Sequence, residues 1–282
     1  MISDGKTHKV PFMNLNEITP LILTYNEQDN LTRTLAALNW AKQIVIVDSG
    51  SADKTLEIAS EFANVKLVTR SFDSHTNQWN FGLSKVSTEW VLTLDADYQC
   101  TPELVAELRD LNDGENAYAI GFNFLVFGRK LRGSIYPPRV CLFPVGNFQY
   151  RQDGHTQLLD LSGIDQPPTL DHRLNHDDRK PVARWLRSQC KYADLEVEKL
   201  FATDRKALGW KDRIRTWIVL APPLTLVYCL FAKGMILDGW AGLYYTLQRV
   251  IAELILSLKL LDYRLRHEDV NRPAIAESQP ER

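Results

Sequence analysis

The sequence has few cysteines and none of the spacings that cysteine-based sites need. Four cysteines occur in 282 residues, and no two of them form a C-x-x-C pair. This pattern argues against a structural zinc site or a disulfide framework and is typical of a reducing compartment. Residues 1–17 also lack the apolar stretch of a secretory signal, so we expect a cytoplasmic location.

Other absences narrow the possible functions. The formal net charge is only -2, which does not favour a nucleic-acid partner. No P-loop and no G-x-G-x-x-G sequence occurs, so kinase, ATPase and dinucleotide oxidoreductase functions lack support. Hydrophobic residues make up 45% and charged residues 24% of the chain, as in a folded protein with a substantial core.

The first hundred residues alternate between two periodicities. Short apolar runs predict strands, and apolar residues at helical spacing between them predict helices. This alternation predicts an α/β fold with a mainly parallel sheet and helices on both faces. The predicted strands are residues 18–24, 43–49, 65–70 and 90–96, and the predicted helices are residues 29–41, 52–63 and about 76–86. Residues 117–165 predict further strands, joined by an irregular loop at 133–138.

The last third of the chain is predicted to be helical from Pro181 onward. Residues 216–232 carry no charge, but Pro222 and Pro223 are expected to break a straight membrane-spanning helix there. Amphipathic segments follow, and five basic residues precede the apolar run: Arg205, Lys206, Lys211, Arg213 and Arg215. We expect a helical hairpin that lies on the cytoplasmic membrane surface, or else a subdomain packed on the core or on a second subunit.

We therefore expect four parts in the chain. They are an extension at 1–16, a nucleotide-sugar-binding and catalytic domain at 17–178, an amphipathic helical region at 179–270 and a flexible tail at 271–282.

Polar residues follow three of the predicted strands at the point where each ends. In a parallel sheet these carboxyl ends meet at one edge, where ligands bind. The residues are Thr24, Tyr25, Asn26 and Glu27 after the first strand, Asp48 after the second, and Asp95 and Asp97 after the fourth. Asp29, Ser51 and Asp53 could instead be ordinary helix caps, and the last two aspartates could form a solvated turn. On one strand, however, both carboxylates face the same way and could share a divalent cation.

These blocks resemble a known family. "PLILTYNEQDNLTRTLAAL", "IVIVDSGSADKTLEIA" and "WVLTLDAD" are similar in order and spacing to the GT-A-fold glycosyltransferases of family 2, which bind a nucleotide-diphosphate sugar. The resemblance implies that Tyr25 flanks the base and that Asp48 hydrogen-bonds to it. It also implies that Asp95 lies near the ribose and the metal, and that Asp97 holds Mg²⁺ or Mn²⁺ on the diphosphate.

Later segments are similar to the lipopolysaccharide-core β-glycosyltransferases of the WaaE/KdtX type, whose C-terminal region is amphipathic and membrane-associated. This resemblance implies a His-Glu pair after the middle strands, but His155 is followed here by Thr156. An inverting transferase needs a base near the acceptor. Asp153 is the first candidate for that base and His155 the second, although Asp153-Gly154 is also a favourable turn pair.

Other candidates carry two interpretations each. His172 and His176 have a metal-ligand spacing, but the stretch at 171–178 is better interpreted as a polar loop. His176 remains a candidate because some transferases of this fold bring a late histidine to the metal. Arg139 could face the diphosphate or pair with a carboxylate. Gln78 and Asn80 are expected on a helix beside the site, with Trp79 in the core.

The sequence thus predicts an inverting, Mg²⁺- or Mn²⁺-dependent glycosyltransferase that acts on a cell-envelope glycan or lipid-linked acceptor at the inner face of the cell membrane. The missing glutamate leaves open a non-catalytic nucleotide-sugar-binding or scaffold protein. A haloacid-dehalogenase-type phosphatase, which also has a D-x-D motif, is disfavoured because its motif follows the first strand.

Overall fold

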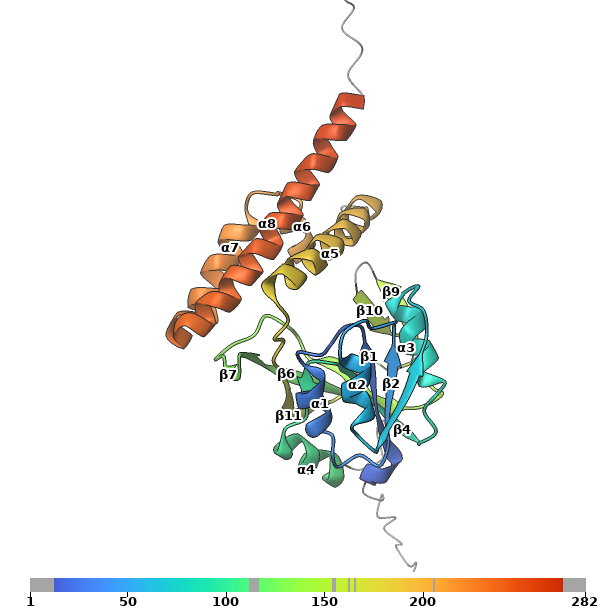
Figure 1. Ribbon diagram of the computed structural model, residues 1–282. Helices are drawn as coiled ribbons and strands as arrows, with labels where there is room; N and C mark the ends of the chain where they lie inside the picture. Colours follow the sequence, from blue (N-terminus) through green and yellow to red (C-terminus); the bar gives the residue numbers. More distant parts are fainter. Residues whose placement is uncertain are drawn as a thin grey trace, which may run out of the picture.

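A computed structural model describes residues 13–111, 117–153, 156–161, 163–164, 166–204 and 206–270. Figure 1 shows an α/β domain built around one twisted sheet, with a group of long helices against one side of it. The described part of the chain starts in this domain, where the first element is the short 3₁₀ turn Leu15–Glu17, and its last element is one of the helices.

The first four long strands form the parallel half of the sheet. They are β1 (Ile18–Thr24), β2 (Ile44–Asp48), β3 (Val65–Thr69) and β4 (Trp90–Asp95), in the spatial order β3-β2-β1-β4. The Ile, Val and Leu runs of β1, β2 and β4 are buried almost throughout, as expected of strands covered on both faces, whereas β3 at the edge is only partly buried. The register pairs Thr24 with Asp48 and Leu23 with Asp95, so the carboxyl ends of three strands lie side by side.

The second half of the sheet is mixed. Strand β8 (Arg139–Pro144) runs antiparallel between β4 and β6 (Tyr118–Val126), and β11 (Thr169–His176) is parallel to β6. Two short strands complete it: β5 (Tyr98–Gln99) pairs with β11, and β7 (Arg129–Lys130) pairs with β6. A separate hairpin consists of β9 (Tyr150–Asp153) and β10 (Thr156–Leu159). The predicted fold class is confirmed, and its parallel character is confined to the first four strands and the β6–β11 pair.

Helices cover both faces of the sheet. Leu35 of α1 (Leu31–Ala36), Ala59 of α2 (Thr55–Ser60) and Leu104 of α4 (Pro102–Asp110) belong to one core cluster, and Trp79 of α3 (His75–Leu83) belongs to the other. Ser74 caps α3 by accepting a hydrogen bond from the amide of Asn77. The candidate caps named from the sequence were misplaced by one residue or more, since Asn30 and not Asp29 precedes α1, and Lys54 follows both Ser51 and Asp53 before α2.

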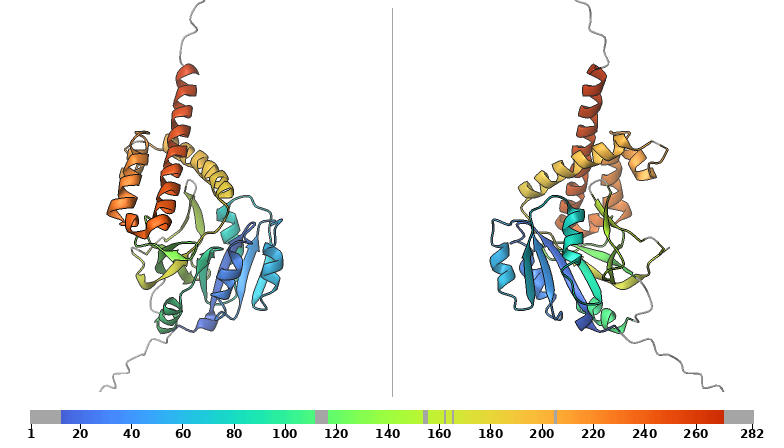
Figure 2. Two further views of the ribbon diagram at one scale, coloured as in Figure 1. Left: turned by 60° about the vertical axis from the view of Figure 1, so that its left-hand side comes forward. Right: turned by 90° about the vertical axis from the view of Figure 1, so that its right-hand side faces the viewer.

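The C-terminal part is helical, as predicted. It contains α5 (Val182–Ala202), α6 (Trp210–Arg215), α7 (Ala221–Val227), a π-helical turn (Tyr228–Ala232), a 3₁₀ turn (Met235–Asp238) and α8 (Gly239–Val270). Pro222 and Pro223 lie in the first turn of α7, so, as predicted, residues 216–232 do not form one straight helix. Residues of α5 and α8, including Val197, Leu200, Leu256 and Leu260, form a third core cluster. Figure 2 shows α8 extending beyond the domain.

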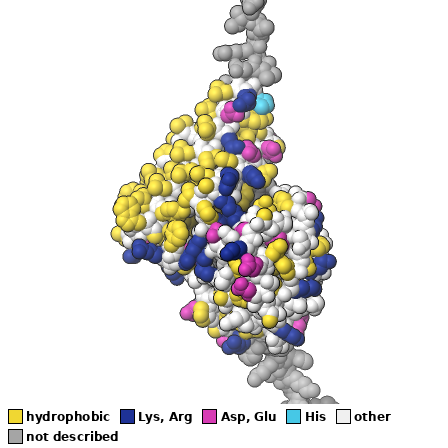
Figure 3. Space-filling view, viewed as in Figure 1, with side chains coloured by type: hydrophobic (Ala, Val, Ile, Leu, Met, Phe, Trp, Pro, Cys, Tyr) yellow, Lys and Arg dark blue, Asp and Glu magenta, His cyan; other side chains and the backbone are white. Residues whose placement is uncertain are grey.

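The helical part exposes many large apolar side chains. Trp240 is 80% exposed, Val219 76%, Leu237 69% and Phe231 64%. Figure 3 shows hydrophobic side chains gathered over these helices, with Lys and Arg near their junction with the domain. No single helix among the described residues is long and apolar enough to cross a membrane. Ala221–Ala232 and Met235–His267, bent by 71°, meet the length and composition criteria only as a pair.

Candidate functional site

The ends of β1, β2 and β4 bring predicted site residues to one edge of the sheet. Asp48 is completely buried there, and its carboxylate accepts hydrogen bonds from the Thr24 hydroxyl at 2.7 Å and the amides of Gly50 and Ser51 at 2.9 and 2.8 Å. The Ser51 hydroxyl donates a further hydrogen bond at 2.5 Å. These donors fix the position of Asp48 between the end of β1 and the loop after β2, and Ser51 of that second loop also contacts the loop that follows β1.

That loop is shaped by a left-handed residue. Asn26 has φ 56°, a conformation in which Asn is one of the few residues that occur readily. Its amide donates to the Ser51 hydroxyl and its side-chain oxygen accepts from the Ala52 amide, both at 2.7 Å. Tyr25 stands beside it with 55% of its surface exposed, so the ring is open to a ligand.

Asp95 and Asp97 differ more than the sequence suggested. Strand β4 ends at Asp95, and Asp97 lies in the turn before β5, so the two are not on one strand face. The Asp95 side chain is 45% exposed and lies 3.6 Å from Arg139 Nη1. Asp97 is buried, and its Oδ2 lies 3.4 Å from His176 Nε2 and 3.7 Å from Lys180 Nζ. Each carboxylate thus has its own cationic partners.

The ionised state of Asp97 is set by neighbouring positive charges. Burial alone would raise the pKa of this carboxyl, but the positive charges of His176 and Lys180 outweigh that effect and hold the pKa well below its ordinary value. Its Oδ1 is buried and accepts no hydrogen bond from the residues that the structure describes. Such an acceptor is costly unless a ligand or an ion contacts it.

His176, at the end of β11, is surrounded by aromatic side chains. Its ring centroid lies 4.5 Å from that of Phe124, 5.0 Å from Tyr98 and 6.5 Å from Tyr136. Burial lowers the pKa of His176, but Asp97 raises it by more, so the net pKa lies above the ordinary value. The prediction that residues 171–178 form a polar loop was wrong for 171–176, because β6 supplies a pairing partner that makes them a strand.

The sequence interpretation missed two cations at the start of α5. Lys180 Nζ lies 3.3 Å from Glu27 Oε1, and the Arg184 guanidinium donates to the carbonyls of Tyr25 and Asn26. Burial raises the pKa of Glu27 to about 7, although Lys180 opposes that shift. The sequence carried a signal for Arg184 alone, because it lies in the first turn of α5, where a cation is opposed by the helix dipole and an anionic neighbour is favourable, but nothing local identified that neighbour.

The other predicted residues that the structure describes have partners of their own. The Asp153 backbone ends β9, but its side chain and all of His155 lie outside the described residues, so their predicted role as base is not tested. His172 pairs with Glu107 of α4, at 3.0 Å, and does not join His176. Gln78 donates to the Ser49 hydroxyl at 2.8 Å, and Asn80 donates to the Tyr150 carbonyl at 3.0 Å.

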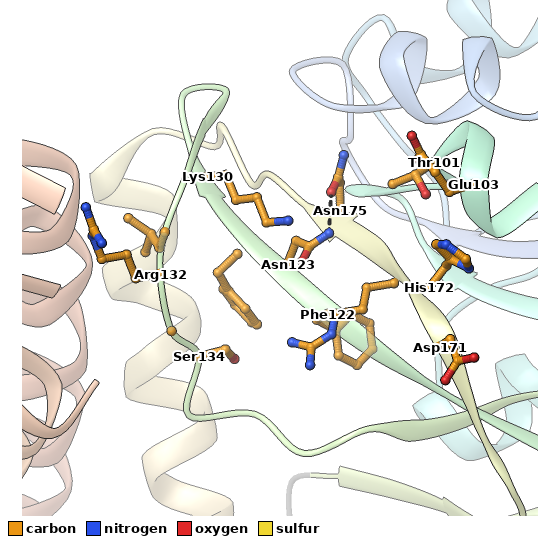
Figure 4. Close-up of a pocket in the computed structure, with 14 residues that line it drawn as sticks. Thr101, Glu103, Phe122, Asn123, Lys130, Arg132, Ser134, Asp171, His172 and Asn175 are labelled. Carbon is orange, nitrogen blue, oxygen red and sulfur yellow. Dashed lines mark hydrogen bonds between the residues drawn. The ribbon is translucent and has the colours of Figure 1, made fainter. Parts of the chain in front are cut away.

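A cavity of about 620 Å³ adjoins the site (Figure 4). Strands β6 and β11 supply Asn123 and Asn175, which share a hydrogen bond of 3.1 Å, and residues 130–134 form another wall. Phe124 lines the cavity as well and contacts the ring of His176. The cavity lining is therefore polar and lies next to the aspartate–histidine pair.

The oxygen and nitrogen atoms of the site suit a metal ion that is bound partly by the protein and partly by the phosphates of a substrate. Among the described residues, no group of three or more His, Cys, Asp or Glu side chains could hold a metal by itself. Mg²⁺ is commonly bound by one or two carboxylates together with substrate phosphates. Asp97, with its free buried Oδ1, fits that requirement, and Asp95 and His176 are the nearest further candidates.

Comparison with known proteins identifies the family. The family model described as glycosyl transferase family 2 matches residues 21–164, half of the chain and all four parallel strands except the start of β1. The chain belongs to glycosyl transferase family 2. It is a glycosyltransferase of GT-A-like fold, as the three sequence blocks indicated.

Individual relatives are more distant. The chain is 20% identical over 272 residues to the lipopolysaccharide core biosynthesis glycosyltransferase LpsC of Rhizobium meliloti, covering 92% of this chain and 96% of LpsC. It is 34% identical over 116 residues to an undecaprenyl-phosphate 4-deoxy-4-formamido-L-arabinose transferase of Edwardsiella ictaluri, but spans only 35% of that protein. Among solved structures, the mannosyltransferase PcManGT of Pyrobaculum calidifontis, in complex with GDP-Man and Mn²⁺, aligns with a TM-score of 0.49 and 14% identity over 94% of this chain and 92% of that one.

Proposed function

We propose that this family 2 enzyme is an inverting, metal-dependent transferase in lipopolysaccharide or related cell-envelope biosynthesis. It would move a sugar from a nucleotide-diphosphate donor to a glycan or lipid-linked acceptor. The observation that carries the proposal is Asp97, a buried carboxylate beside His176, at the edge of the sheet where the family binds its donor; one of its oxygens has no hydrogen-bond partner among the described residues. The names of LpsC and the arabinose transferase support the class of acceptor.

The donor would lie along the edge formed by β2, β1 and β4. Asp48 and Tyr25 would receive the base, with Thr24, Asn26 and Glu27 shaping their loop, and Asp95 would lie toward the ribose. Asp97, Asp95 and His176 would hold Mg²⁺ or Mn²⁺, which supplies positive charge for the departing diphosphate. Arg139 lies beside Asp95 and could contribute charge to the same group.

The transfer itself is a single displacement. A base takes the proton of the acceptor hydroxyl, the hydroxyl oxygen bonds to the anomeric carbon, and the bond from that carbon to the diphosphate oxygen breaks. One displacement inverts the anomeric centre. Asp153 is our first choice for the base, with His155 as the second. The cavity beside Phe124 would hold the acceptor saccharide, since it is polar and adjoins His176.

We further propose that the helices from α5 to α8 rest on the inner face of the cell membrane. Support comes from the exposed apolar side chains, such as Trp240 and Phe231, and from the basic residues at the junction with the domain. Part of the predicted basic cluster faces inward, since Arg215 lies 2.7 Å from Glu253. Arg205 and the side chain of Lys211 lie outside the described residues.

A donor panel tests the enzymatic proposal. Purified protein with Mn²⁺ is given UDP-, GDP- and other nucleotide sugars, and release of nucleoside diphosphate is measured with core-oligosaccharide or lipid-linked extract. We expect acceptor-dependent release with one donor, lost in Asp97→Ala and in Asp153→Asn. Donor binding that requires Asp97 but leads to no turnover would support the alternative, a non-catalytic nucleotide-sugar-binding or scaffold protein.

Vesicle sedimentation tests the membrane proposal separately. We expect the protein to pellet with vesicles containing anionic lipid, and the double variant Phe231→Glu with Trp240→Glu to remain in solution. If wild type does not bind vesicles but forms dimers, and the double variant is monomeric, these helices pack on a second subunit instead.

A further inference from the structure

Lys180, two residues before the start of α5, places a positive charge among the carboxylates of the site. Lys180 Nζ lies 3.3 Å from Glu27, 3.5 Å from Asp178 and 3.7 Å from Asp97, and only 20% of its side chain is exposed. One buried ammonium therefore neutralises parts of three carboxylates that belong to three segments of the chain.

Lys180 is held in place from several directions. Its own amide donates to Asp178 Oδ1 at 3.1 Å, and the same oxygen accepts from Asn30 Nδ2 at 3.0 Å. Arg184, four residues on, is anchored on the loop after β1. These contacts fix the backbone at Lys180, and the ammonium itself is held beside Asp97 by its contacts with Glu27 and Asp178.

This position has opposite effects on two ligands. A divalent cation that approaches Asp97 meets the charge of Lys180 at close range, and like charges repel strongly where solvent is largely excluded. A nucleoside diphosphate brings negative charge into the same space, and Lys180 then attracts it. Taken together, the two effects favour binding of the divalent cation with the diphosphate over binding of the cation alone.

We propose that Lys180 is a built-in counter-cation of the donor site, which suppresses binding of the free divalent ion and makes the ion enter with the nucleotide diphosphate. This inference rests on the proposed function and adds an order of binding to it. Lys180 acts through Asp97 and the diphosphate charge and is in that sense a positioning residue.

The test compares three proteins: wild type, Lys180→Met, which removes the charge but keeps an apolar stem, and Lys180→Arg, which keeps the charge. Mn²⁺ binding is measured by electron paramagnetic resonance without nucleotide. Binding of UDP and of GDP in the presence of Mn²⁺ is measured by calorimetry. Circular dichroism and thermal unfolding verify that each variant is folded.

We expect Lys180→Met to bind free Mn²⁺ about tenfold more tightly than wild type and the Mn²⁺–nucleotide pair about tenfold more weakly. Lys180→Arg should stay within about threefold of wild type in both measurements. A purely structural lysine would weaken both kinds of binding in Lys180→Met. That result, or unchanged or undetectable binding of free Mn²⁺ by Lys180→Met, would overturn the inference.

Loss of one charge from a buried cluster can unfold a protein. If Lys180→Met does not fold, the double variant Lys180→Met with Glu27→Gln removes one positive and one negative charge, and it should bind free Mn²⁺ more tightly than the single variant Glu27→Gln. Failure of the proposed function has a different signature: wild type would bind no nucleotide with or without Mn²⁺, whereas the Mn²⁺ measurement alone still decides the role of Lys180.

Discussion

Glu27 should make the stability of this protein fall as the pH rises through the weakly acidic range. Burial raises the pKa of this carboxyl from 4.5 to about 7. The folded chain therefore keeps a proton on Glu27 at pH values where the unfolded chain has lost it. The stabilisation is complete below pH 4.5 and is lost by about pH 7, and at 1.36 kcal/mol per unit it amounts to about 3 kcal/mol.

The measurement is urea unfolding of wild type and Glu27→Gln between about pH 5 and pH 8, with EDTA present to remove metal ions. The amide that Glu27→Gln introduces cannot titrate, so the free energy of unfolding of wild type should fall relative to that of the variant as the pH increases. Glu57→Gln, at an exposed position on α2, is the matched control and should follow wild type. If the curves for wild type and Glu27→Gln run parallel, the reasoning about Glu27 is refuted.

Two further predictions concern packing and thiol access. Gly82→Ala should lower the free energy of unfolding by about 1–3 kcal/mol, because an added Cβ would lie 2.7 Å from Leu21 Cδ1 in a close-packed core. Chemical denaturation measures this change. In a protein that already carries Leu21→Ala, Gly82→Ala should lower the free energy of unfolding by less, because the clashing side chain is gone. One of the four thiols should react rapidly with an aromatic disulfide reagent, since Cys190 is exposed and the other three are buried; rapid reaction that persists in Cys190→Ser would contradict this.

Much of the parallel half of the sheet was predictable because each strand is a short, uninterrupted apolar run. Strand β1 was predicted at its observed bounds, and β2, β3 and β4 within one residue at each end. Strand β11 was not, since only Leu170 and Leu174 of its residues are buried and its other side chains are polar. It is a strand because β6 and β5 lie on either side of it, and a partner in space leaves little trace in local sequence.

The residues of the candidate site were predictable from the sequence only where they end a predicted strand. Residues at the ends of apolar runs, such as Asp48 and Asp95, could be placed at the sheet edge from the sequence because topology fixes where those runs end. Lys180 and Arg184 could not, since their contacts span about 150 residues of chain and depend on where α5 begins. Asp97 was predicted beside Asp95, but its partners followed only from the path of β11.

The place of β11 in the sheet bears on how the chain acquires its structure. The family match ends at residue 164, but β6 and β5 both pair with β11, which lies between them and begins only at Thr169. A nascent chain that has emerged only as far as residue 164 has open edges on β6 and β5, which are surfaces that pair with other chains. Such a fragment should aggregate, and the domain can close only after His176 has left the ribosome.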